Sequence, residues 1–460
     1  MKYSIVAAAL ALSTAGQAVA HIGRGVPHNL MDKRDAHGAG SLTHVKRAPS
    51  PSVTDEASAA TNTVAAQECQ AYSLPEVAAM KSSFPTVWQS AAIVSGDTAA
   101  NNVWNEIQQS GIIPSDVKQK GTGGKGDFTS VTPTYSKSDP DCWWSYNNCV
   151  TPKHSKIPDD IYQCPEPETW GLTFDDGPNC SHNAFYDFLR DNKQKASLFY
   201  IGSNVMDWPL EAQRGIVEGH HVCVHTWSHQ YMTQLDNPTV FAELYYTAKA
   251  IKDITGVTPR CWRPPFGDVD DRVRAIATGL GLSTNIWTDD TDDWKIEPQG
   301  TLPKSSIDAN YNKILSKDYS TTGNIVLTHE IDAETMAEFM SFYPQIQKKF
   351  KNIVPITACM NETKPYPEDI TYPNFADYVK GNIEPSGIPT SSNIKVQPSA
   401  SYDPIAAASE TSASGDSTGG SASSSQKSQS TTTSSSAPAS AAVPVLSLIA
   451  LVSMAFALTA

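Results

Sequence analysis

Two adjacent carboxylates form the first candidate site in the sequence. Asp175 and Asp176 follow the apolar run 170–174 and are followed directly by Gly177-Pro178. The apolar run predicts a buried strand, and Gly-Pro predicts where it ends. Because neighbouring side chains of a strand point in opposite directions, one carboxylate could hold a cation while the other stays free for proton transfer. A plain turn also favours these residue types, so the segment alone leaves both interpretations open.

A histidine pair lies farther along the chain. His225 and His229 are at positions i and i+4 and follow a second apolar run, 221–224. One carboxylate oxygen and two imidazole nitrogens are a common ligand set of catalytic zinc, which leaves positions open for water. A lone histidine pair at this spacing is more often incidental, but together with the two carboxylates it predicts a metal site. The neighbouring His220 and His221 are expected at the surface.

Three more polar clusters each follow a predicted strand. Arg263 begins the segment Arg-Pro-Pro-Phe-Gly, residues 290–294 form an acidic turn that ends in Trp294, and His329 follows an apolar run. The planar guanidinium of arginine suits a carboxylate partner. The structural alternatives are a surface arginine, a helix-start turn and a partly buried histidine. Enzymes with parallel strands place their chemistry at the carboxyl ends of those strands, so the five clusters together predict one shared active site.

These segments, in this order, resemble the motifs of a known family. Thr-Phe-Asp-Asp-Gly, His-Thr-x-x-His and Arg-x-Pro-Phe are similar to those of the polysaccharide deacetylases, the NodB-homology carbohydrate esterases, and the resemblance runs from near Trp170 to near Cys359. Within the family, the chain looks like the GPI-anchored cell-wall chitin deacetylases of basidiomycete yeasts. The resemblance implies an enzyme with one divalent ion, Zn2+ or Co2+. It would hydrolyse the N-acetyl groups of N-acetylglucosamine units in chitin to give chitosan and acetate.

The resemblance also implies a role for each residue that matches a motif. Asp175 is the expected general base, and Arg263 is expected to hold it in its ionised form. Asp176, His225 and His229 are the expected metal ligands. The chemistry agrees with these residue types, because a divalent metal lowers the pKa of bound water and a charged carboxylate can accept the proton of that water.

The remaining motifs imply a proton donor and the residue that orients it. His329 is the expected general acid for the leaving nitrogen. The acid of the fourth motif positions and tunes this histidine, and Asp290 fits that role by its distance from Trp294, whereas Asp293 is the second candidate. Glu330 stands where the family more often has Asp, so no role is assigned to it.

Contacts with the acetyl group follow from the same resemblance. The backbone N–H of Phe266 is expected to donate to the oxyanion, and because the contact uses the backbone, the change from the more common Tyr should cost little. Trp294 and Leu327 are expected to form the wall of the pocket that takes the acetyl methyl group.

The pattern of apolar runs predicts the fold class. Strand-like and helix-like segments alternate, which predicts parallel βαβ units. The family resemblance makes this an α/β fold, a distorted (β/α) barrel with fewer than the usual eight strands. The predicted strands are 196–201, 221–224, 282–287, 325–327 and 353–356, and the predicted helices are 182–192, 209–218, 238–254, 269–280 and 335–350.

Composition limits the class of protein. The chain has 460 residues, a formal net charge of −14 and 40% hydrophobic residues, which permits a sizeable core. So acidic a chain is a poor binder of nucleic acid, and no nucleic-acid partner is expected. Lys2, the apolar stretch 5–12 and the ending Ala-Val-Ala at 18–20 predict a secretory signal peptide, with an N-terminal membrane helix as the alternative.

The sequence predicts five successive segments, the last of which is a signal for attachment of a lipid anchor. They are a signal peptide (1–20), an N-terminal extension with a possible pro-segment cleaved after Lys46-Arg47 (21–160), the deacetylase domain (161–361), a linker and Ser/Thr-rich stalk (362–436) and a tail (437–460). The apolar tail after a small-residue spacer predicts a GPI-attachment signal, and a retained tail-anchor helix is the alternative. The expected location is therefore outside the cell, anchored to the plasma membrane by a GPI lipid and in contact with cell-wall glucan and chitin.

Cysteines and sequons agree with secretion. All eight cysteines follow the signal segment, so disulfides are expected, but their connectivity stays open. Cys223 and Cys261 lie close to proposed site residues, and metal binding is the alternative for them. Asn361 and Asn179 stand in glycosylation sequons. Asn361 is the expected site, because a glycan on Asn179 could crowd the cleft and a bonded Cys180 could prevent attachment.

Two rival functions remain open at this stage. The same machinery could remove acetyl groups from another polysaccharide, such as acetylxylan, because loops outside the motifs choose the sugar. The chain could also be a cell-wall mannoprotein that binds chitin without turnover. Turnover is favoured, because the metal ligands, the base, its arginine and the acid are all present.

Overall fold

The computed structural model describes residues 53–399, 402 and 404. The predicted signal peptide, the Lys46-Arg47 processing site and the predicted GPI tail lie outside these residues, as does the predicted stalk except for Tyr402 and Pro404. Within the part of the chain that is described, no helix is both long enough and apolar enough to cross a bilayer.

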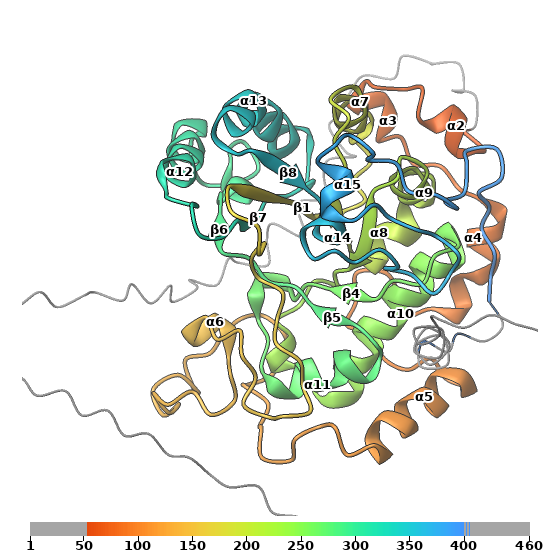
Figure 1. Cartoon of the computed structure of the whole chain (residues 1–460). Helices are drawn as coiled ribbons and strands as arrows, with labels where there is room; N and C mark the ends of the chain where they lie inside the picture. The colour runs from red at the N-terminus through yellow and green to blue at the C-terminus, as the bar shows by residue number, and fades with distance from the viewer. Residues whose placement is uncertain (1–52, 400–401, 403, 405–460) are drawn as a thin grey trace, which may run out of the picture. The chain divides into compact units, whose positions relative to one another are not determined.

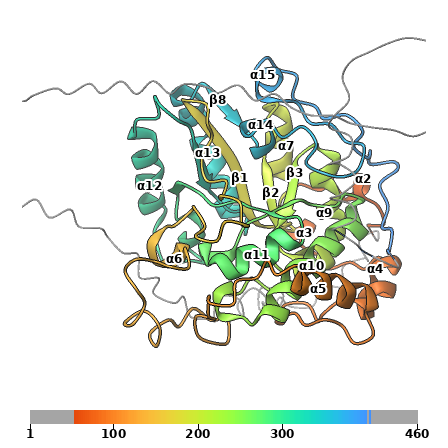
Figure 2. The same ribbon diagram turned by 60° about the horizontal axis from the view of Figure 1, so that its bottom comes forward.

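A single sheet of parallel strands organises the described residues. The strand order is β5-β4-β3-β2-β1-β7-β6, and β8 pairs with β1 as well. Figure 1 and the turned view in Figure 2 show β1 in the middle of the fold, and Figure 2 shows β2 and β3 beside it. The strands are β1 (Thr169–Gly177), β2 (Ser197–Tyr200), β3 (His221–Val224), β4 (Cys261–Trp262), β5 (Ser283–Thr284), β6 (Asp289–Asp290), β7 (Asn324–Leu327) and β8 (Asn352–Val354).

Helices connect most of the strands and cover the sheet. The N-terminal extension carries α2 (Glu56–Ala59), α3 (Ala65–Glu68), α4 (Pro75–Met80), α5 (Thr98–Gln109) and α6 (Trp144–Asn147). The rest are α7 (Asn183–Asp191), α8 (Gly202–Asp207), α9 (Pro209–Val217), α10 (Asn237–Thr255), α11 (Asp271–Gly279), α12 (Lys304–Ser316), α13 (Ala333–Lys349), α14 (Ile356–Cys359) and α15 (Phe375–Tyr378).

The predicted distorted (β/α) barrel is confirmed. Helices follow all the strands except β5, which is followed directly by β6, and every pairing between these strands is parallel. The expectation of fewer than eight strands is wrong, since the sheet has eight, but β4, β5 and β6 are only two residues long. All nine residues of β1 are buried, as expected for the central strand of a sheet covered on both faces.

The longest helix, α10, shows how local sequence sets an element that later matters for the site. The side chain of Asp236 accepts a hydrogen bond from the backbone N–H of Thr239, and Pro238 lies in the first turn, where its missing N–H costs nothing. Gly256 ends the helix in the left-handed region, with φ of 84°. Most of the helix is buried, including the carboxylate of Glu243.

The N-terminal extension packs against the barrel helices over its described length. A disulfide joins Cys69 to Cys180, next to the end of β1. The indole N–H of Trp88 donates to Asp207 at 3.0 Å, and the backbone N–H of Ala91 donates to Glu243 at 2.8 Å. Figure 1 shows the short helices α2 to α4 beside α9 and α10. The extension is therefore part of the same folded body as the sheet.

The segment after Cys359 differs from the predicted linker. The hydroxyl of Tyr366 accepts from the backbone N–H of Val222 at 2.7 Å, and the hydroxyl of Tyr372 donates to the carbonyl oxygen of His220 at 2.8 Å. The prediction that a linker begins at residue 362 is wrong for residues 363–399. Buried aromatic rings with paired hydroxyls fix this segment onto β3, although its composition resembles that of a linker.

Candidate active site

The carboxyl ends of neighbouring strands bring the predicted residues together. Asp175 and Asp176 end β1, His225 follows β3, Arg263 follows β4 and His329 follows β7. The ends of β1 and β7 are tied by backbone hydrogen bonds from Asp175 N to Thr328 O at 2.9 Å and from Glu330 N to Asp175 O at 3.0 Å. The sheet therefore gathers side chains that are separated by up to 154 residues along the chain, from Asp175 to His329.

A bulge at the end of β1 re-aims the two carboxylates. The register of β1 on β2 shifts between Asp175 and Gly177, and Asp176 has a φ of 70°. A bulge places an extra residue in one strand and turns its side chain away from the regular alternation. As a result the Nε2 of His225 lies 3.8 Å from Asp175 Oδ2 and 3.4 Å from Asp176 Oδ1. The two carboxylates thus converge, whereas simple alternation predicts that they diverge.

Asp176, His225 and His229 form a group suited to a metal ion. Each offers one ligand atom, and these atoms all lie within 4.8 Å of one another. The Nε2 of His229 lies 3.0 Å from Asp176 Oδ1. The Nδ1 of His225 lies 2.9 Å from the carbonyl oxygen of Arg263, which directs its Nε2 toward the carboxylate. Like Asp176, His229 lies in the left-handed region, with φ of 54°, and such strained residues concentrate at functional sites.

The environment of Asp176 fits a cation. Its Oδ1 is buried and accepts no hydrogen bond from the described residues, although two imidazole nitrogens lie within 3.4 Å. Burial alone would raise the pKa of Asp176, but the imidazoles of His229 and His225 bring it well below the ordinary value. A charged carboxylate and two imidazoles are the donor set of a catalytic divalent-metal site.

Asp175 is paired with a buried arginine. The Arg263 guanidinium donates to Asp175 Oδ1 at 2.7 Å and to the hydroxyl of Thr173 at 2.9 Å. Arg263 has no exposed surface, and its guanidinium carbon lies 4.1 Å from the centroid of the Phe199 ring. The pairing predicted for Asp175 and Arg263 is therefore present, and Asp175 Oδ2 remains on the side of His225.

His329 contacts Asp293, and this corrects the sequence analysis. The Nδ1 of His329 lies 2.6 Å from Asp293 Oδ1, whereas Asp290 is exposed and its carboxylate accepts a hydrogen bond from Asp292 N at 2.8 Å. The prediction that Asp290 positions His329 is wrong. The chain turns at Asp292, which has a φ of 55°, and this turn aims Asp293 inward. Burial lowers the pKa of His329, but Asp293 outweighs it and raises the pKa to about 9.

The expected acetyl-binding residues lie on the chain segments that carry the residues of this centre. Phe266 has a φ of 59°, and its ring lies edge-on to His229, with centroids 4.7 Å apart. Leu327 is buried and lies two residues before His329, and Trp294 directly follows Asp293 and is half-buried. Their roles as oxyanion donor and pocket wall stay predictions.

A carboxylate that no sequence motif predicts holds the loop between His225 and His229. Glu243 on α10 is fully buried and accepts hydrogen bonds from Trp227 N and Ser228 N, both at 2.8 Å, and from Ser228 Oγ at 2.6 Å. It also accepts the bond from Ala91 N in the extension. Trp227 and Ser228 lie between the two histidines of the metal group. An acid within the apolar stretch 240–246 is the signal that could have revealed it.

Four disulfides account for all eight cysteines. They are Cys69–Cys180, Cys142–Cys149, Cys164–Cys359 and Cys223–Cys261. The pairing of Cys223 with Cys261 excludes the alternative that these two thiols bind a metal. This bridge joins β3 to β4 two residues before His225 and Arg263, so it also fixes the spacing of two site residues.

The two sequons differ in their surroundings. The side-chain amide of Asn179 donates to the carbonyl oxygen of Ile331, and its Oδ1 accepts bonds from Ser181 N and Ser181 Oγ. Cys180, in the middle of this sequon, is in a disulfide. Asn361 is exposed, and its Oδ1 accepts a bond from Phe375 N at 3.0 Å.

Comparison with known proteins identifies the family. Residues 162–284 match the family described as polysaccharide deacetylase. The chain is 52% identical over 383 residues to chitin deacetylase 2 of Cryptococcus neoformans var. grubii, which covers 82% of this chain and 81% of that protein. It is 45% identical over 329 residues to a chitin deacetylase of Amylomyces rouxii, covering 70% of this chain and 76% of that protein. Among solved structures, the chitin deacetylase of Colletotrichum lindemuthianum aligns with a TM-score of 0.43 and 25% identity, over 46% of this chain and 96% of that one. The chain belongs to the polysaccharide deacetylase family.

Proposed function

We propose that the protein is a metal-dependent chitin deacetylase. It hydrolyses the N-acetyl groups of N-acetylglucosamine units in chitin and produces chitosan and acetate. The relatives that it resembles over most of their length are named chitin deacetylases. The observation that carries the proposal is the convergence of the Asp176, His225 and His229 group, the arginine-paired Asp175 and the acid-paired His329 in one site.

The residues of this site divide the reaction between them. Asp176, His225 and His229 would hold the ion, Zn2+ or Co2+, which when bound lowers the pKa of water and polarises a carbonyl. Asp175, with Oδ1 occupied by Arg263, would take the water proton at Oδ2. The backbone N–H of Phe266 would donate to the oxygen on which negative charge develops.

His329 would complete the hydrolysis on the side of the leaving group. The water oxygen bonds to the acetyl carbon, the carbon–nitrogen bond breaks, and the proton on His329 passes to the departing amine. Since the pKa of His329 is raised to about 9, the imidazole carries this proton at neutral pH. The products are acetate and a free amino group on the sugar.

Variants of Asp175 test the proposal. We expect Asp175→Asn to retain one equivalent of metal yet to lose acetate release from chitin oligomers by about 10²–10⁴-fold, the usual contribution of a general base. A chelator should stop release by the native protein, and added Zn2+ or Co2+ should restore it. Unchanged release by Asp175→Asn would overturn the assignment.

A comparison of substrates distinguishes chitin deacetylation from acetylxylan deacetylation and from chitin binding without turnover. Mass spectrometry of chitin, xylan and peptidoglycan fragments after incubation should show mass losses of acetyl groups on chitin oligomers first. Faster loss from acetylxylan would reassign the substrate. Chitin binding without any metal-dependent acetate release would instead favour the non-catalytic mannoprotein.

The predicted location is part of the same proposal. Secretion, a GPI lipid anchor in the plasma membrane and contact with cell-wall glucan and chitin would place the enzyme beside its polymer. The cell-wall substrate of the proposed reaction supports an extracellular site, and phosphatidylinositol phospholipase C should release the protein from membranes if the anchor is attached. Retention after that treatment would favour a tail-anchor helix.

A further inference from the structure

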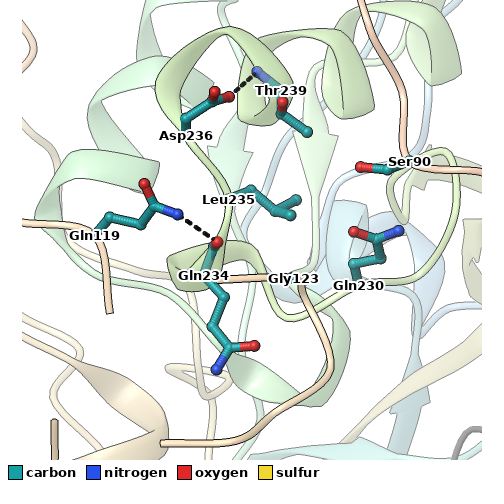
Figure 3. A pocket seen from close by; sticks show the side chains of 8 residues that line it. All are labelled: Ser90, Gln119, Gly123, Gln230, Gln234, Leu235, Asp236 and Thr239. Carbon is teal, nitrogen blue, oxygen red and sulfur yellow. Dashed lines mark hydrogen bonds between the residues drawn. The ribbon is translucent and has the colours of Figure 1, made fainter. Parts of the chain in front are cut away.

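A pocket of about 330 Å³ lies between two parts of the chain, one of which directly follows the proposed metal ligand His229. The N-terminal extension and the segment that follows His229 both line it, as Figure 3 shows. The lining residues are Ser90, Gln119 and Gly123 from the extension, and Gln230, Gln234, Leu235, Asp236 and Thr239 from the other segment.

The pocket starts one residue from a proposed metal ligand. Gln230 follows His229 directly, and consecutive Cα atoms are about 3.8 Å apart. Next along the chain, the ring of Tyr231 stacks on that of Phe266, with centroids 3.9 Å apart and planes within 5° of parallel. Phe266 in turn lies edge-on to His229. The rings of His229, Phe266 and Tyr231 are therefore in contact in that order, and Tyr231 directly follows Gln230 of the pocket lining.

A glycine-rich loop of the extension packs closely against the side chains of Gln230 and Tyr231. Gly124 and Gly126 have φ of 64° and 78°, and a Cβ at Gly126 would lie 2.5 Å from the ring of Tyr231. A Cβ at Gly124 would lie 2.4 Å from the side-chain oxygen of Gln230. Only glycine allows the backbone to approach so closely in this conformation.

Hydrogen bonds hold the same loop in place. Tyr231 N donates to Gly124 O at 3.1 Å, Gly126 N donates to Gln234 Oε1 at 2.9 Å, and Gln234 Nε2 donates to Asp127 O at 2.6 Å. The wall that the extension contributes is therefore built into the fold. It is absent from a minimal deacetylase domain that begins at residue 161.

The chemistry of the lining suits a neutral polyhydroxyl ligand. Gln119 is oriented by its hydrogen bond to the carbonyl oxygen of Gln234 at 2.7 Å, which leaves its amide oxygen to accept (Figure 3). The amide of Gln230 and the hydroxyl of Ser90 can each donate and accept. One oxygen of Asp236 caps α10, and buried Leu235 supplies an apolar surface. Sugars offer hydroxyl and acetamide groups around an apolar ring face, which such a lining can satisfy.

We infer that this pocket is a saccharide subsite that takes a neighbouring unit of the N-acetylglucosamine chain while another unit lies at the metal group. The inference rests on the proposed deacetylase function. It assigns to the N-terminal extension the recognition of substrate length, because long chains reach the pocket and short ones do not.

Two variants of the full-length protein test the subsite, and a third controls for them. Ser90→Trp fills the pocket, Gln119→Ala removes one amide, and Gln108→Ala removes an exposed amide elsewhere in the extension. The measurement is the ratio of kcat/KM for acetate release from the N-acetylglucosamine pentamer to that from the dimer. We expect the ratio to fall about tenfold or more in Ser90→Trp and about two- to tenfold in Gln119→Ala, the usual range for one hydrogen bond. Gln108→Ala should keep the native ratio.

Binding of the N-acetylglucosamine pentamer tests the subsite independently of catalysis. In the Asp175→Asn background, titration with the pentamer gives a Kd, and adding Ser90→Trp should weaken it by a similar factor. Metal content and Tm of each variant show that it is folded. A native kcat/KM ratio together with a native Kd in Ser90→Trp would overturn the subsite. If the native protein releases no acetate from any chitin oligomer, the proposed function fails, while the Kd comparison still decides whether the pocket binds sugar.

Discussion

Asp293 holds His329 by two atoms of the same carboxylate. Its Oδ2 accepts the backbone N–H of His329 at 2.8 Å, and its Oδ1 lies 2.6 Å from the ring Nδ1. Asp293 has no exposed surface, so the pair interacts with little screening by solvent. The paired ring leaves Nε2 as the nitrogen that can serve the substrate.

This pair predicts the alkaline limit of activity. Since the pKa of His329 is raised to about 9, the protonated acid form persists up to that pH, and kcat should fall as the pH rises through it. In Asp293→Asn the charge that contributes most to raising the pKa of His329 is removed. We expect the alkaline limb of the kcat profile to move down toward the ordinary value of 6.5, with a loss of up to about 30-fold near pH 8, where the protonated fraction of His329 falls. A pH series of acetate release from chitin oligomers measures this shift.

Asp290→Asn is the matched variant for this prediction. Asp290 lies three residues earlier and is exposed, and its carboxylate accepts a bond from Asp292 N instead. The alkaline limb of the kcat profile should shift much less in Asp290→Asn than in Asp293→Asn. Equal shifts in the two variants would show that general electrostatics, and not the direct contact, sets the pKa of His329.

Glu243 leads to a second prediction, on metal affinity. Glu243→Gln keeps the shape of the side chain but replaces one acceptor oxygen by a donor. In either orientation of the amide this donor faces a backbone N–H, that of Ala91 on the Oε1 side or those of Trp227 and Ser228 on the Oε2 side. We expect the loop to loosen and the Kd for Zn2+ to rise by about 10–100-fold, the range seen when groups that support metal ligands are changed. Competition with a chromophoric chelator measures this Kd.

A second buried acid on α10 separates this effect from loss of stability. Asp253 is also fully buried, but it pairs with Lys249 at 2.5 Å and accepts a bond from Ser399 N at 3.0 Å. Asp253→Asn should lower Tm while leaving the metal Kd at its native value. If both variants lower Tm and neither changes the Kd, Glu243 has only a structural role.

The centre of the site could be predicted from the sequence because its residues stand in short motifs at strand ends. Asp176 and His225 are far apart in sequence, yet each ends or follows a strand of one parallel sheet, so topology alone brings them close. The bulge that turns Asp176 was not predicted. It depends on how β1 pairs with β2, which the sequence of β1 alone does not specify.

The error at Asp290 has a physical cause. Four carboxylates lie within residues 289–293, and spacing from Trp294 does not tell which one points inward. The left-handed conformation of Asp292 and the short 3-10 helix Asp293–Lys295 break the alternation of strand side chains. Direction in such a turn is set by backbone conformation, which residue type only weakly predicts.

Burial by distant segments explains a second error. His220 and His221 were expected at the surface, but both are buried. The Nδ1 of His220 accepts from Ala196 N at 3.1 Å, the Nδ1 of His221 lies 3.0 Å from Ser197 Oγ, and the hydroxyl of Tyr372 covers the carbonyl of His220. Tyr372 lies 152 residues later in a segment whose composition predicts a linker, so no local pattern announces this contact.

The two sequons give the last prediction, which concerns modification. Asn361 is exposed. The side-chain amide of Asn179, which lies just after the end of β1, donates a hydrogen bond to the carbonyl oxygen of Ile331, and its sequon contains a disulfide-bonded cysteine. We expect a glycan on Asn361 and none on Asn179 in the secreted protein. Enzymatic deglycosylation in heavy-oxygen water, followed by peptide mass spectrometry, marks each formerly glycosylated Asn. Thr363→Ala should abolish the mark at Asn361, and because that sequon is remote from the metal group in sequence and follows the last strand, acetate release should stay at the native rate. A glycan found on Asn179 of active enzyme would show that its hydrogen bond to Ile331 is not needed to form the active site at the end of β1.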